Sequence, residues 1–343
     1  MVVGVSMIGA GYWGRNLLRN LQAADEVSLL SLCDTDEGKA RRLLGEYSTV
    51  PVCGSIDAVL EDSRVDAVVI ATPVATHCDL ALAAIEAGKH VLVEKPLAAS
   101  ASDGAKMVQA AKDNGVVLMV DHTFCYAPAV RRLAAMVRGG ELGEIQYIDS
   151  VRTNLGIVQP DVDVLWDLGP HDLSILEAVL PPDVRPAAVS AVVSTPSHLG
   201  RPASVHMSVR LSNGAIAHAY ESWLSPVKSR RMVIGGSRRI AVWNDVDPVQ
   251  PLVVYDRGVD PAGPDTGAPA SYRSGDAVSL ALPGDEPLHT MIGEFVDAIA
   301  HGCNPRTDGE AGLRVLRQLE AASVSHASDG GFVTLAAGEG DQW

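Results

Sequence analysis

Residues 2–14 read VVGVSMIGAGYWG and decide the fold of this chain. A short apolar, β-branched segment runs directly into three glycines at the spacing G-x-G-x-x-G, and a helical stretch, Tyr12–Leu21, follows at once. In a dinucleotide-binding turn Gly9 makes the tight bend, Gly11 lets the backbone approach a pyrophosphate, and Gly14 packs helix against strand. The phosphates would lie at the helix N-terminus, where free N–H groups and the helix dipole favour an anion. The stretch therefore predicts a dinucleotide-binding loop.

A second apolar segment, Val27–Cys33, ends in Asp34, twenty positions beyond Gly14. A dinucleotide fold carries at this place the carboxylate that binds the ribose 2′-hydroxyl. Because a carboxylate repels a 2′-phosphate, Asp34 favours NAD as the cofactor, with NADP as the alternative. The other interpretation is a solvated turn aspartate that precedes a helix.

Composition limits the kind of protein. The chain has 343 residues, enough for two domains with separate cores, and 47% apolar with 20% charged residues is typical of a soluble globular protein. A formal net charge of −15 argues against nucleic acid or an anionic membrane as partner. The five cysteines include no C-x-x-C pair and the ten histidines no H-E-x-x-H, so we expect no metal. The N-terminus shows no cleavable leader and no apolar run is long enough to span a membrane, so we expect a cytoplasmic protein.

Strands and helices alternate along residues 1–121. Six apolar, strand-like segments are separated by helical segments, which predicts a doubly wound parallel sheet of the Rossmann type. The handedness of the connections puts a ligand at the C-terminal edge of the sheet. We therefore expect an α/β dinucleotide-binding domain over residues 1–121.

The pattern of predicted strands and helices changes in residues 122–343. One helix over residues 128–138 precedes strand-like segments joined by tight turns, which predicts a mainly antiparallel sheet. Residues 245–287 are rich in proline, glycine and aspartate and predict an extended arm with short strands at 252–255 and 278–282. We expect an α+β domain with a large open sheet, closed by two C-terminal helices, that binds the substrate and forms the oligomer.

Glu94-Lys95-Pro96 lie at the C-terminal end of the fifth predicted strand, the edge where a nicotinamide ring should lie. A lysine there can hydrogen-bond a substrate hydroxyl and stabilise a developing alkoxide. Pro96 would rigidify the turn that aims it. The alternative is a surface Glu–Lys pair at a strand end.

The loop Thr72-Pro73 follows the fourth strand and should pass beside the cofactor, together with His77. His77 could equally be an ordinary helix-cap residue. His122, at the end of the sixth strand, lines the site or packs at the domain junction. The candidates for cofactor binding are Gly9, Gly11, Tyr12, Trp13, Gly14, Asp34, Thr35, Thr72, Pro73, His77, Glu94, Lys95 and Pro96.

We expect a helix to begin within residues 165–173. Pro170 should lie in its first turn, because a proline is tolerated there and not farther along a helix. Asp167 and His171 are four apart, so they project on one face if the helix extends back to Asp167. A carboxylate and an imidazole presented together make a general base with an orienting partner. The alternative is a structural histidine. Asp172 is expected to be solvated or to cap the helix.

Together these features resemble the glucose-fructose oxidoreductase / inositol dehydrogenase / rhizopine catabolism (Gfo/Idh/MocA) family of NAD(P)-dependent sugar and polyol oxidoreductases. The resemblance covers nearly the whole chain, with motifs in order and spacing at Gly9–Gly14, Ala71–His77, Ala87–Pro96 and Asp167–His171. It implies a hydride transfer between nicotinamide and a ring hydroxyl or ketone of a sugar.

Within that family the chain looks most like bacterial nucleotide-sugar 3-dehydrogenases of the UDP-N-acetyl-2-amino-2-deoxyglucuronate dehydrogenase type. The resemblance implies Lys95, Asp167 and His171 as the catalytic set, with His171 the favoured proton-transfer residue. The substrate-binding candidates are Lys95, His122, Tyr126, Arg152, Asp163, Asp167 and His171. Where that subfamily is expected to carry an asparagine, this chain has Asp163, and a carboxylate there suits an anionic uronate poorly. A neutral nucleotide deoxysugar, or a sugar outside nucleotide metabolism, becomes more credible.

Three alternatives stay open. One is an inositol or free-sugar dehydrogenase, another is a 3-ketoreductase of a deoxysugar pathway, and a third, of another class, is a non-catalytic sensor that holds the dinucleotide. We also expect a homodimer or homotetramer built through the sheet of the second domain. The apolar positions Val205, Met207 and Val209 alternate along one predicted strand and are expected on the face that a partner covers.

Overall fold

The computed structural model of the chain describes residues 1–260 and 270–335, which divide into two compact units. The first unit consists of residues 1–126 and 285–317, and the second takes residues 127–284 and 318 onward. The domain boundary drawn from the sequence follows residue 121. The first unit takes in the late segment because helix α8 (Pro287–His301) packs on α1 (Gly14–Ala23) and on the short helix η2 (Thr123–Tyr126).

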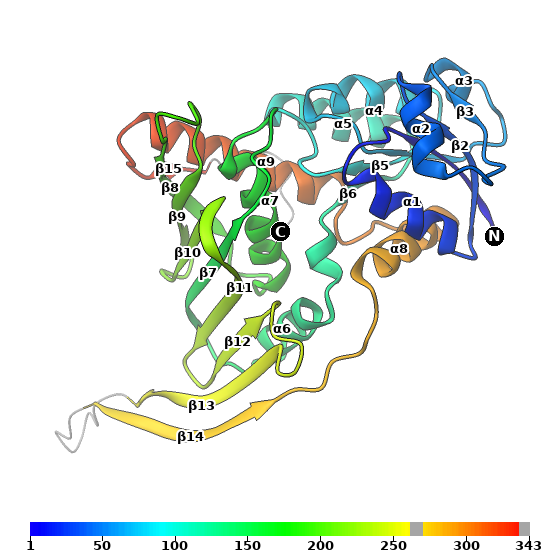
Figure 1. Cartoon of the computed structure of the whole chain (residues 1–343). Coiled ribbons are helices and arrows are strands. Elements are labelled where there is room, and N and C mark those ends of the chain that lie inside the picture. The colour runs from blue at the N-terminus through cyan, green and yellow to red at the C-terminus, as the bar shows by residue number, and fades with distance from the viewer. Residues whose placement is uncertain (261–269, 336–343) are drawn as a thin grey trace. The chain divides into compact units, whose positions relative to one another are not determined.

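The first unit contains a six-stranded parallel sheet in the order β3-β2-β1-β4-β5-β6 (Figure 1). This confirms the predicted doubly wound Rossmann sheet. Its strands are β1 (Val3–Ile8), β2 (Val27–Cys33), β3 (Val52–Cys53), β4 (Ala67–Ile70), β5 (His90–Glu94) and β6 (Leu118–Asp121). Its helices, besides α1, α8 and η2, are α2 (Glu37–Leu44), α3 (Asp57–Leu60), η1 (Val74–Thr76), α4 (His77–Glu86) and α5 (Ala101–Asn114).

Strands β1, β4 and β6 are buried at every residue, as expected for a parallel sheet with helices on both faces. Local signals delimit the helices. Ser100 caps α5 by accepting a hydrogen bond from the N–H of Asp103, and Gly115 ends that helix in the left-handed conformation. Because all six strands run parallel, the loops that follow β1, β2, β4, β5 and β6 meet at one edge.

The second unit contains a nine-stranded sheet in the order β14-β13-β12-β11-β7-β10-β9-β8-β15. Every neighbouring pair is antiparallel except β10 with β7, so the mainly antiparallel sheet is confirmed. The strands are β7 (Ile145–Leu155), β8 (Pro186–Ser194), β9 (Ser204–Leu211), β10 (Ile216–Ser222), β11 (Leu224–Gly236), β12 (Ile240–Asn244), β13 (Leu252–Asp260), β14 (Ser271–Ser279) and β15 (Val333–Thr334). The helices are α6 (Pro128–Arg138), α7 (Val164–Val179) and the later part of α9 (Gly309–Ala327).

The arm predicted over residues 245–287 is a long hairpin. Figure 1 shows β13 and β14 paired as extended strands at the edge of the sheet. The strand expected at 278–282 instead occupies Ser271–Ser279, because its pairing register is set by contact with β13 rather than by its own apolar residues. Residues 261–269, which fall within the predicted arm, lie outside the described residues.

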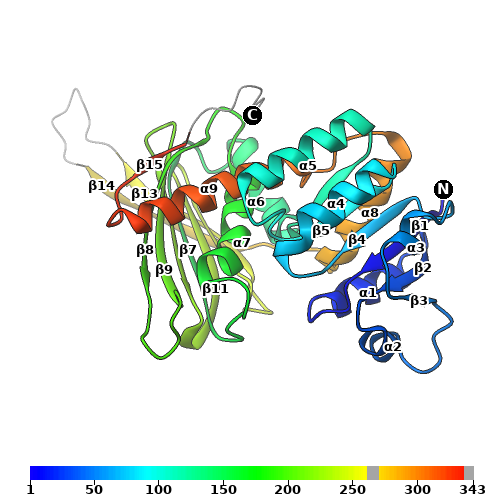
Figure 2. The same cartoon turned by 90° about the horizontal axis from the view of Figure 1, so that it is seen from above.

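Helix α7 lies along one face of the nine-stranded sheet (Figure 2). The prediction that Val205, Met207 and Val209 occupy the open face is wrong: all three are buried, and Met207 and Val209 lie beside Leu173 of α7. The alternate residues of the same strand face the other way, among them His206, whose ring stacks on Tyr220 at 4.4 Å. Within the described ranges, no helix is both long and apolar enough to cross a membrane.

Candidate functional site

The glycine loop joins β1 to α1 in the first unit. Gly9 has φ of +100°, and a Cβ there would lie 2.5 Å from the carbonyl oxygen of Ala71. A Cβ on Gly14 would lie 2.8 Å from the Met7 side chain. By contrast, a Cβ on Gly11 would make only an ordinary contact, 3.5 Å from the same oxygen of Ala71. The chain itself requires Gly9 and Gly14, whereas Gly11 leaves open space, as a loop that admits a pyrophosphate should.

The start of α1 supports the same assignment. Trp13 occupies the N-cap position and its side chain makes no capping bond, so among the described residues the first N–H groups of the helix are left for a ligand or water. The indole N–H of Trp13 donates to the carboxylate of Asp121 at 2.8 Å, which ties the loop to the end of β6. Tyr12 is 78% exposed. The loop therefore fits a dinucleotide, held by its backbone and by the end of α1.

Asp34 lies directly after β2, beside the glycine loop. Its carboxylate accepts hydrogen bonds from the N–H groups of Ala10 at 2.7 Å and Asp36 at 2.9 Å. These bonds orient the carboxylate at the loop, where a ribose would follow the pyrophosphate. Its neighbour Thr35 is exposed.

His77 links the loops after β4 and β5. The ring is buried, with Nδ1 at 3.0 Å from the carbonyl oxygen of Pro96 and Nε2 at 2.9 Å from that of Thr72. His77 thus positions the Glu94-Lys95-Pro96 turn relative to the loop that also holds Pro73. The structure places all of these residues at the C-terminal edge of the parallel sheet.

Two carboxyl groups and an imidazole surround the start of this turn. Glu94 and Asp121 are in register on β5 and β6. Burial, and then the neighbouring Asp121, raise the pKa of the Glu94 carboxyl. His122 is buried, and within the described residues neither ring nitrogen has a hydrogen-bond partner. Burial, followed by the charge of Lys95, lowers the pKa of His122 to about 3, so the ring is neutral at physiological pH.

In the second unit, the predicted site residues Asp163, Asp167 and His171 lie at or on helix α7. Asp163 caps it by accepting a hydrogen bond from the N–H of Trp166 at 3.0 Å. The helix begins at Val164, so Pro170 lies inside it, and the expectation that this proline sits in the first turn is wrong. The missing N–H of the proline leaves one bond of the helical ladder unmade, and the helix tolerates the loss. Because helical geometry includes both Asp167 and His171, these two side chains project on the same face.

Asp167 is oriented by a residue that sequence reasoning missed. The indole N–H of Trp223, which follows β10, donates to the Asp167 carboxylate at 3.0 Å. The two residues are 56 positions apart, and no motif in the sequence connects them. Trp223 is buried and His171 is partly buried, both within the second unit.

Beneath this face of α7 is a buried charge cluster. Arg152 on β7 donates through Nε and Nη2 to Asp172 at 3.1 and 2.9 Å, and Ser150 donates to the same carboxylate. Asp172 is therefore neither solvated nor a helix cap, since the tertiary fold brings β7 against it. Glu221 is also fully buried, and burial, followed by Asp172, raises the pKa of its carboxyl.

Two of the substrate-binding candidates are engaged within their own units. Arg152 makes the buried ion pair just described, with 6% of its side chain exposed. Tyr126 is fully buried, and its hydroxyl lies 3.0 Å from that of Thr307 and 3.3 Å from Glu294. The structure gives both residues a packing role and leaves them little surface for a substrate.

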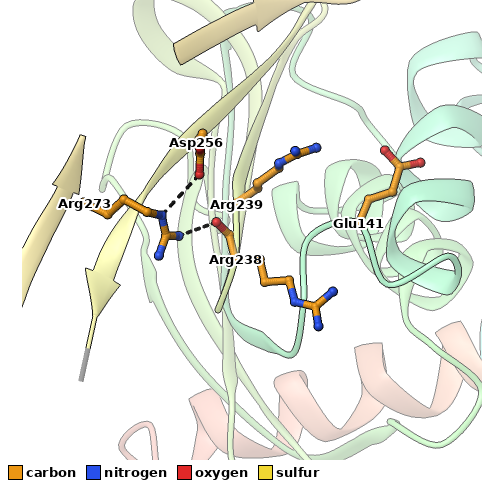
Figure 3. A pocket seen from close by; sticks show the side chains of 5 residues that line it. All are labelled: Glu141, Arg238, Arg239, Asp256 and Arg273. Carbon is orange, nitrogen blue, oxygen red and sulfur yellow. Dashed lines mark hydrogen bonds and ion pairs between the residues drawn. The ribbon is translucent and has the colours of Figure 1, made fainter. Parts of the chain in front are cut away.

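A cavity of about 390 Å³ in the second unit is lined by Glu141, Arg238, Arg239, Asp256 and Arg273 (Figure 3). None of the predicted site residues lines it. Its guanidinium groups point in different directions, with Arg273 turned toward Asp256 at 3.2 Å. Glu141 is paired with Arg132 outside it. The cavity is a surface ion-pair network without convergent donors. Within the described residues no group of His, Cys, Asp and Glu side chains is arranged to hold a metal ion.

Comparison with known proteins agrees with this geometry. Residues 3–122 match the oxidoreductase family with the NAD-binding Rossmann fold, and residues 130–242 match the GFO/IDH/MocA C-terminal domain. The chain is 31% identical to UDP-N-acetylglucosamine 3-dehydrogenase of Acidithiobacillus ferrooxidans over 316 residues, which cover 90% of this chain and 93% of that enzyme.

Solved structures are similar over the whole length. The structure of that Acidithiobacillus enzyme, GnnA, matches with a TM-score of 0.80 at 27% identity, covering 96% of this chain and 99% of the other. GenD2 from gentamicin A biosynthesis, solved in complex with NAD, matches with a TM-score of 0.80 at 26% identity over 98% and 97% of the two chains. The dTDP-3,4-didehydro-2,6-dideoxy-alpha-D-glucose 3-reductase of Saccharopolyspora spinosa is 25% identical over 92% of this chain and 94% of that enzyme.

Proposed function

The chain belongs to the Gfo/Idh/MocA family of NAD-binding oxidoreductases, and from that premise we propose that it transfers a hydride at C3 of a nucleotide-linked sugar. The observation that carries this proposal is the similarity to a UDP-N-acetylglucosamine 3-dehydrogenase along nine-tenths of the chain. The similarity to a reductase of a dTDP-linked dideoxyglucose derivative supports the same substrate class. Neutral deoxysugars are therefore among the candidate substrates.

Three side chains carry the chemistry in this proposal. The cofactor, held by the glycine loop and Asp34, supplies a hydride acceptor when bound. His171 takes the proton of the sugar hydroxyl, and Lys95 donates a hydrogen bond to the same oxygen as negative charge develops there. Asp167, fixed by the indole of Trp223, stabilises the protonated imidazole. In the reverse direction the same groups protonate the oxygen of a reduced ketone.

His122 supports the site from inside the first unit. Its ring is uncharged beside Lys95 and buried, so it holds the neighbourhood of Lys95 without competing for the proton of the sugar. Asp163 is used as a helix cap, so its carboxylate is oriented toward the backbone N–H of Trp166. A carboxylate engaged in this way repels an anionic uronate less than a free one would. Both uronates and neutral sugars therefore stay in the proposed substrate class.

We further propose a cytoplasmic homodimer or homotetramer that binds neither nucleic acid nor membrane. The open face of the nine-stranded sheet supports the oligomer, because Val192 and Ile216 are 57% and 44% exposed there. The net charge of −15 supports the absence of nucleic acid as a partner.

The test is a screen for NAD reduction at fixed enzyme concentration. UDP-N-acetylglucosamine, its uronate and a dTDP-deoxyhexose are compared with myo-inositol and free xylose, and borodeuteride trapping of the product locates the ketone. We expect turnover with a nucleotide sugar and deuterium at C3. Turnover with inositol or xylose but with no nucleotide sugar would contradict the proposal and favour an inositol or free-sugar dehydrogenase. NADH binding without turnover on any substrate would favour the sensor.

Substitutions test the roles of the side chains. Lys95→Ala and His171→Ala should each lower turnover by about 10²-fold or more, as expected for a positioned acid–base or oxyanion-stabilising group. Asp167→Asn should retain more activity than either alanine variant, since the amide keeps the bond with Trp223. Near-normal turnover in His171→Ala would mean that the proton leaves by another group, with Lys95 the first candidate.

A further inference from the structure

Two cysteines lie side by side at the edge of the first unit's parallel sheet. Cys33 is the last residue of β2 and Cys53 the last of β3, and the two are direct partners in the parallel register. Partners in register direct their side chains to the same face of a sheet, and neighbouring strands lie about 4.8 Å apart. That separation falls within the Cα–Cα range of about 4.4–6.8 Å over which a disulfide closes.

The surroundings allow the gap between the sulfur atoms to close. Strand β3 has only two residues and lies at the end of the sheet order, so β2 is its only sheet neighbour among the described residues (Figure 1). A short edge strand can shift toward its neighbour without breaking a second ladder. Glycine follows directly at position 54, where a Cβ would meet only the Glu37 side chain.

The two thiols differ in access. Cys33 is 4% exposed, whereas Cys53 is partly exposed at the sheet edge. Burial, and then the neighbouring thiol of Cys53, raise the pKa of Cys33 to about 12. Cys33 is therefore protonated and shielded, and a small oxidant reaches Cys53 first.

We propose that Cys33 and Cys53 form a reversible disulfide when the protein meets a peroxide. The Cys53 sulfur attacks one peroxide oxygen, the O–O bond breaks, and a sulfenic acid and one water result. The Cys33 sulfur then attacks the Cys53 sulfur, loses its proton and displaces the second water. Two thiols and one hydrogen peroxide thus give one disulfide and two waters, and a dithiol restores the thiols.

The disulfide acts on the cofactor site through the adjoining residue. Asp34 directly follows Cys33, and its N–H donates to the carbonyl oxygen of Cys53 at 3.1 Å. Its carboxylate receives the N–H of Ala10 in the glycine loop. Drawing β3 toward β2 moves the Cys53 carbonyl that holds the Asp34 N–H, and so shifts the Asp34 carboxylate relative to Ala10. Oxidation should therefore weaken NADH binding by several-fold. This inference rests on the dinucleotide site and not on the identity of the sugar.

The experiment uses the full chain treated with hydrogen peroxide and then with dithiothreitol. Alkylation, proteolysis and mass spectrometry identify the linked peptides, and NADH fluorescence measures the Kd in each state. We expect one link, between Cys33 and Cys53, together with a several-fold higher Kd that dithiothreitol reverses. Cys53→Ser should abolish both effects. Cys303→Ser, at an exposed cysteine away from β3, is the matched control and should behave like the parent protein.

Two results would overturn the proposal. Peptides that carry Cys33 and Cys53 but stay unlinked, or link only through Cys303, would exclude the disulfide. A complete Cys33–Cys53 link with an unchanged Kd for NADH would exclude its effect on the cofactor site. If Cys53→Ser fails to fold, peptide mapping of the parent protein and of Cys303→Ser still decides both points.

Discussion

At the residue scale, the prediction of which dinucleotide the loop prefers rests on Asp34. Its carboxylate is held against the glycine loop by the N–H of Ala10 and would face the ribose 2′-oxygen. We expect tighter binding of NADH than of NADPH, because a 2′-phosphate would meet this negative charge. Asp34→Ser should narrow the difference by about tenfold, the effect of about 1.4 kcal/mol. Side-by-side fluorescence titrations measure it, and tighter NADPH binding by the parent protein would contradict the prediction.

The buried His122 makes the free energy of unfolding depend on pH. In the folded state its pKa is about 3, against 6.5 for a free histidine, because burial and Lys95 oppose the charge. Below pH 6.5 the unfolded chain binds a proton that the folded chain does not, so stability falls as the pH drops from 6.5 toward 3. Between these two values the free energy of unfolding falls by up to about 1.4 kcal/mol for each pH unit.

His122→Leu should therefore flatten the pH dependence of the free energy of unfolding. Urea denaturation near neutral pH and at about pH 5 measures the slope. His301→Leu, at an exposed histidine, is the control and should keep the slope of the parent protein. An equal slope in His122→Leu would show that other groups dominate the acid response.

At the scale of elements, the end of β11 depends on a close backbone approach. A Cβ on Gly236 would lie 2.1 Å from the carbonyl oxygen of Leu142, beside a register shift between β11 and β7. Since a backbone atom cannot move aside cheaply, Gly236→Ala should cost about 2 kcal/mol of stability. Gly284→Ala, at a position with no described atom within 4 Å of the added Cβ, should change the stability by less than about 0.5 kcal/mol. Equal denaturation midpoints for the two variants would refute the argument.

At the scale of the whole molecule, the proposed oligomer is built on the open sheet face. Val192 and Ile216 are exposed on it beside the stacked His206–Tyr220 pair. We expect a dimer or tetramer in solution, because a second copy of this face would cover these side chains. Light scattering at micromolar concentration measures the mass. Val192→Asp should shift the distribution toward monomer, and a monomer mass for the parent protein would remove the proposal.

The sequence by itself determined the features that arise from neighbouring residues. The Rossmann sheet follows from apolar segments that alternate with helical ones, and the loop from three glycines spaced to join a strand to a helix. The same local pattern located most of the second sheet. It also put Asp167 and His171 four residues apart, which makes them share a face once the helix includes both.

Only the tertiary structure decided what depends on residues far apart in the chain. The indole that orients Asp167 comes from Trp223, and the partner of the buried Asp172 is Arg152 on another element. What covers the apolar face of β9 could not be known either. Alternation puts Val205, Met207 and Val209 on one face of the strand and polar residues on the other, but a helix of the same chain or a second copy could cover the apolar face, and α7 packs there. Alternation along a strand says which face must be buried, whereas the element that buries it is selected by the tertiary packing.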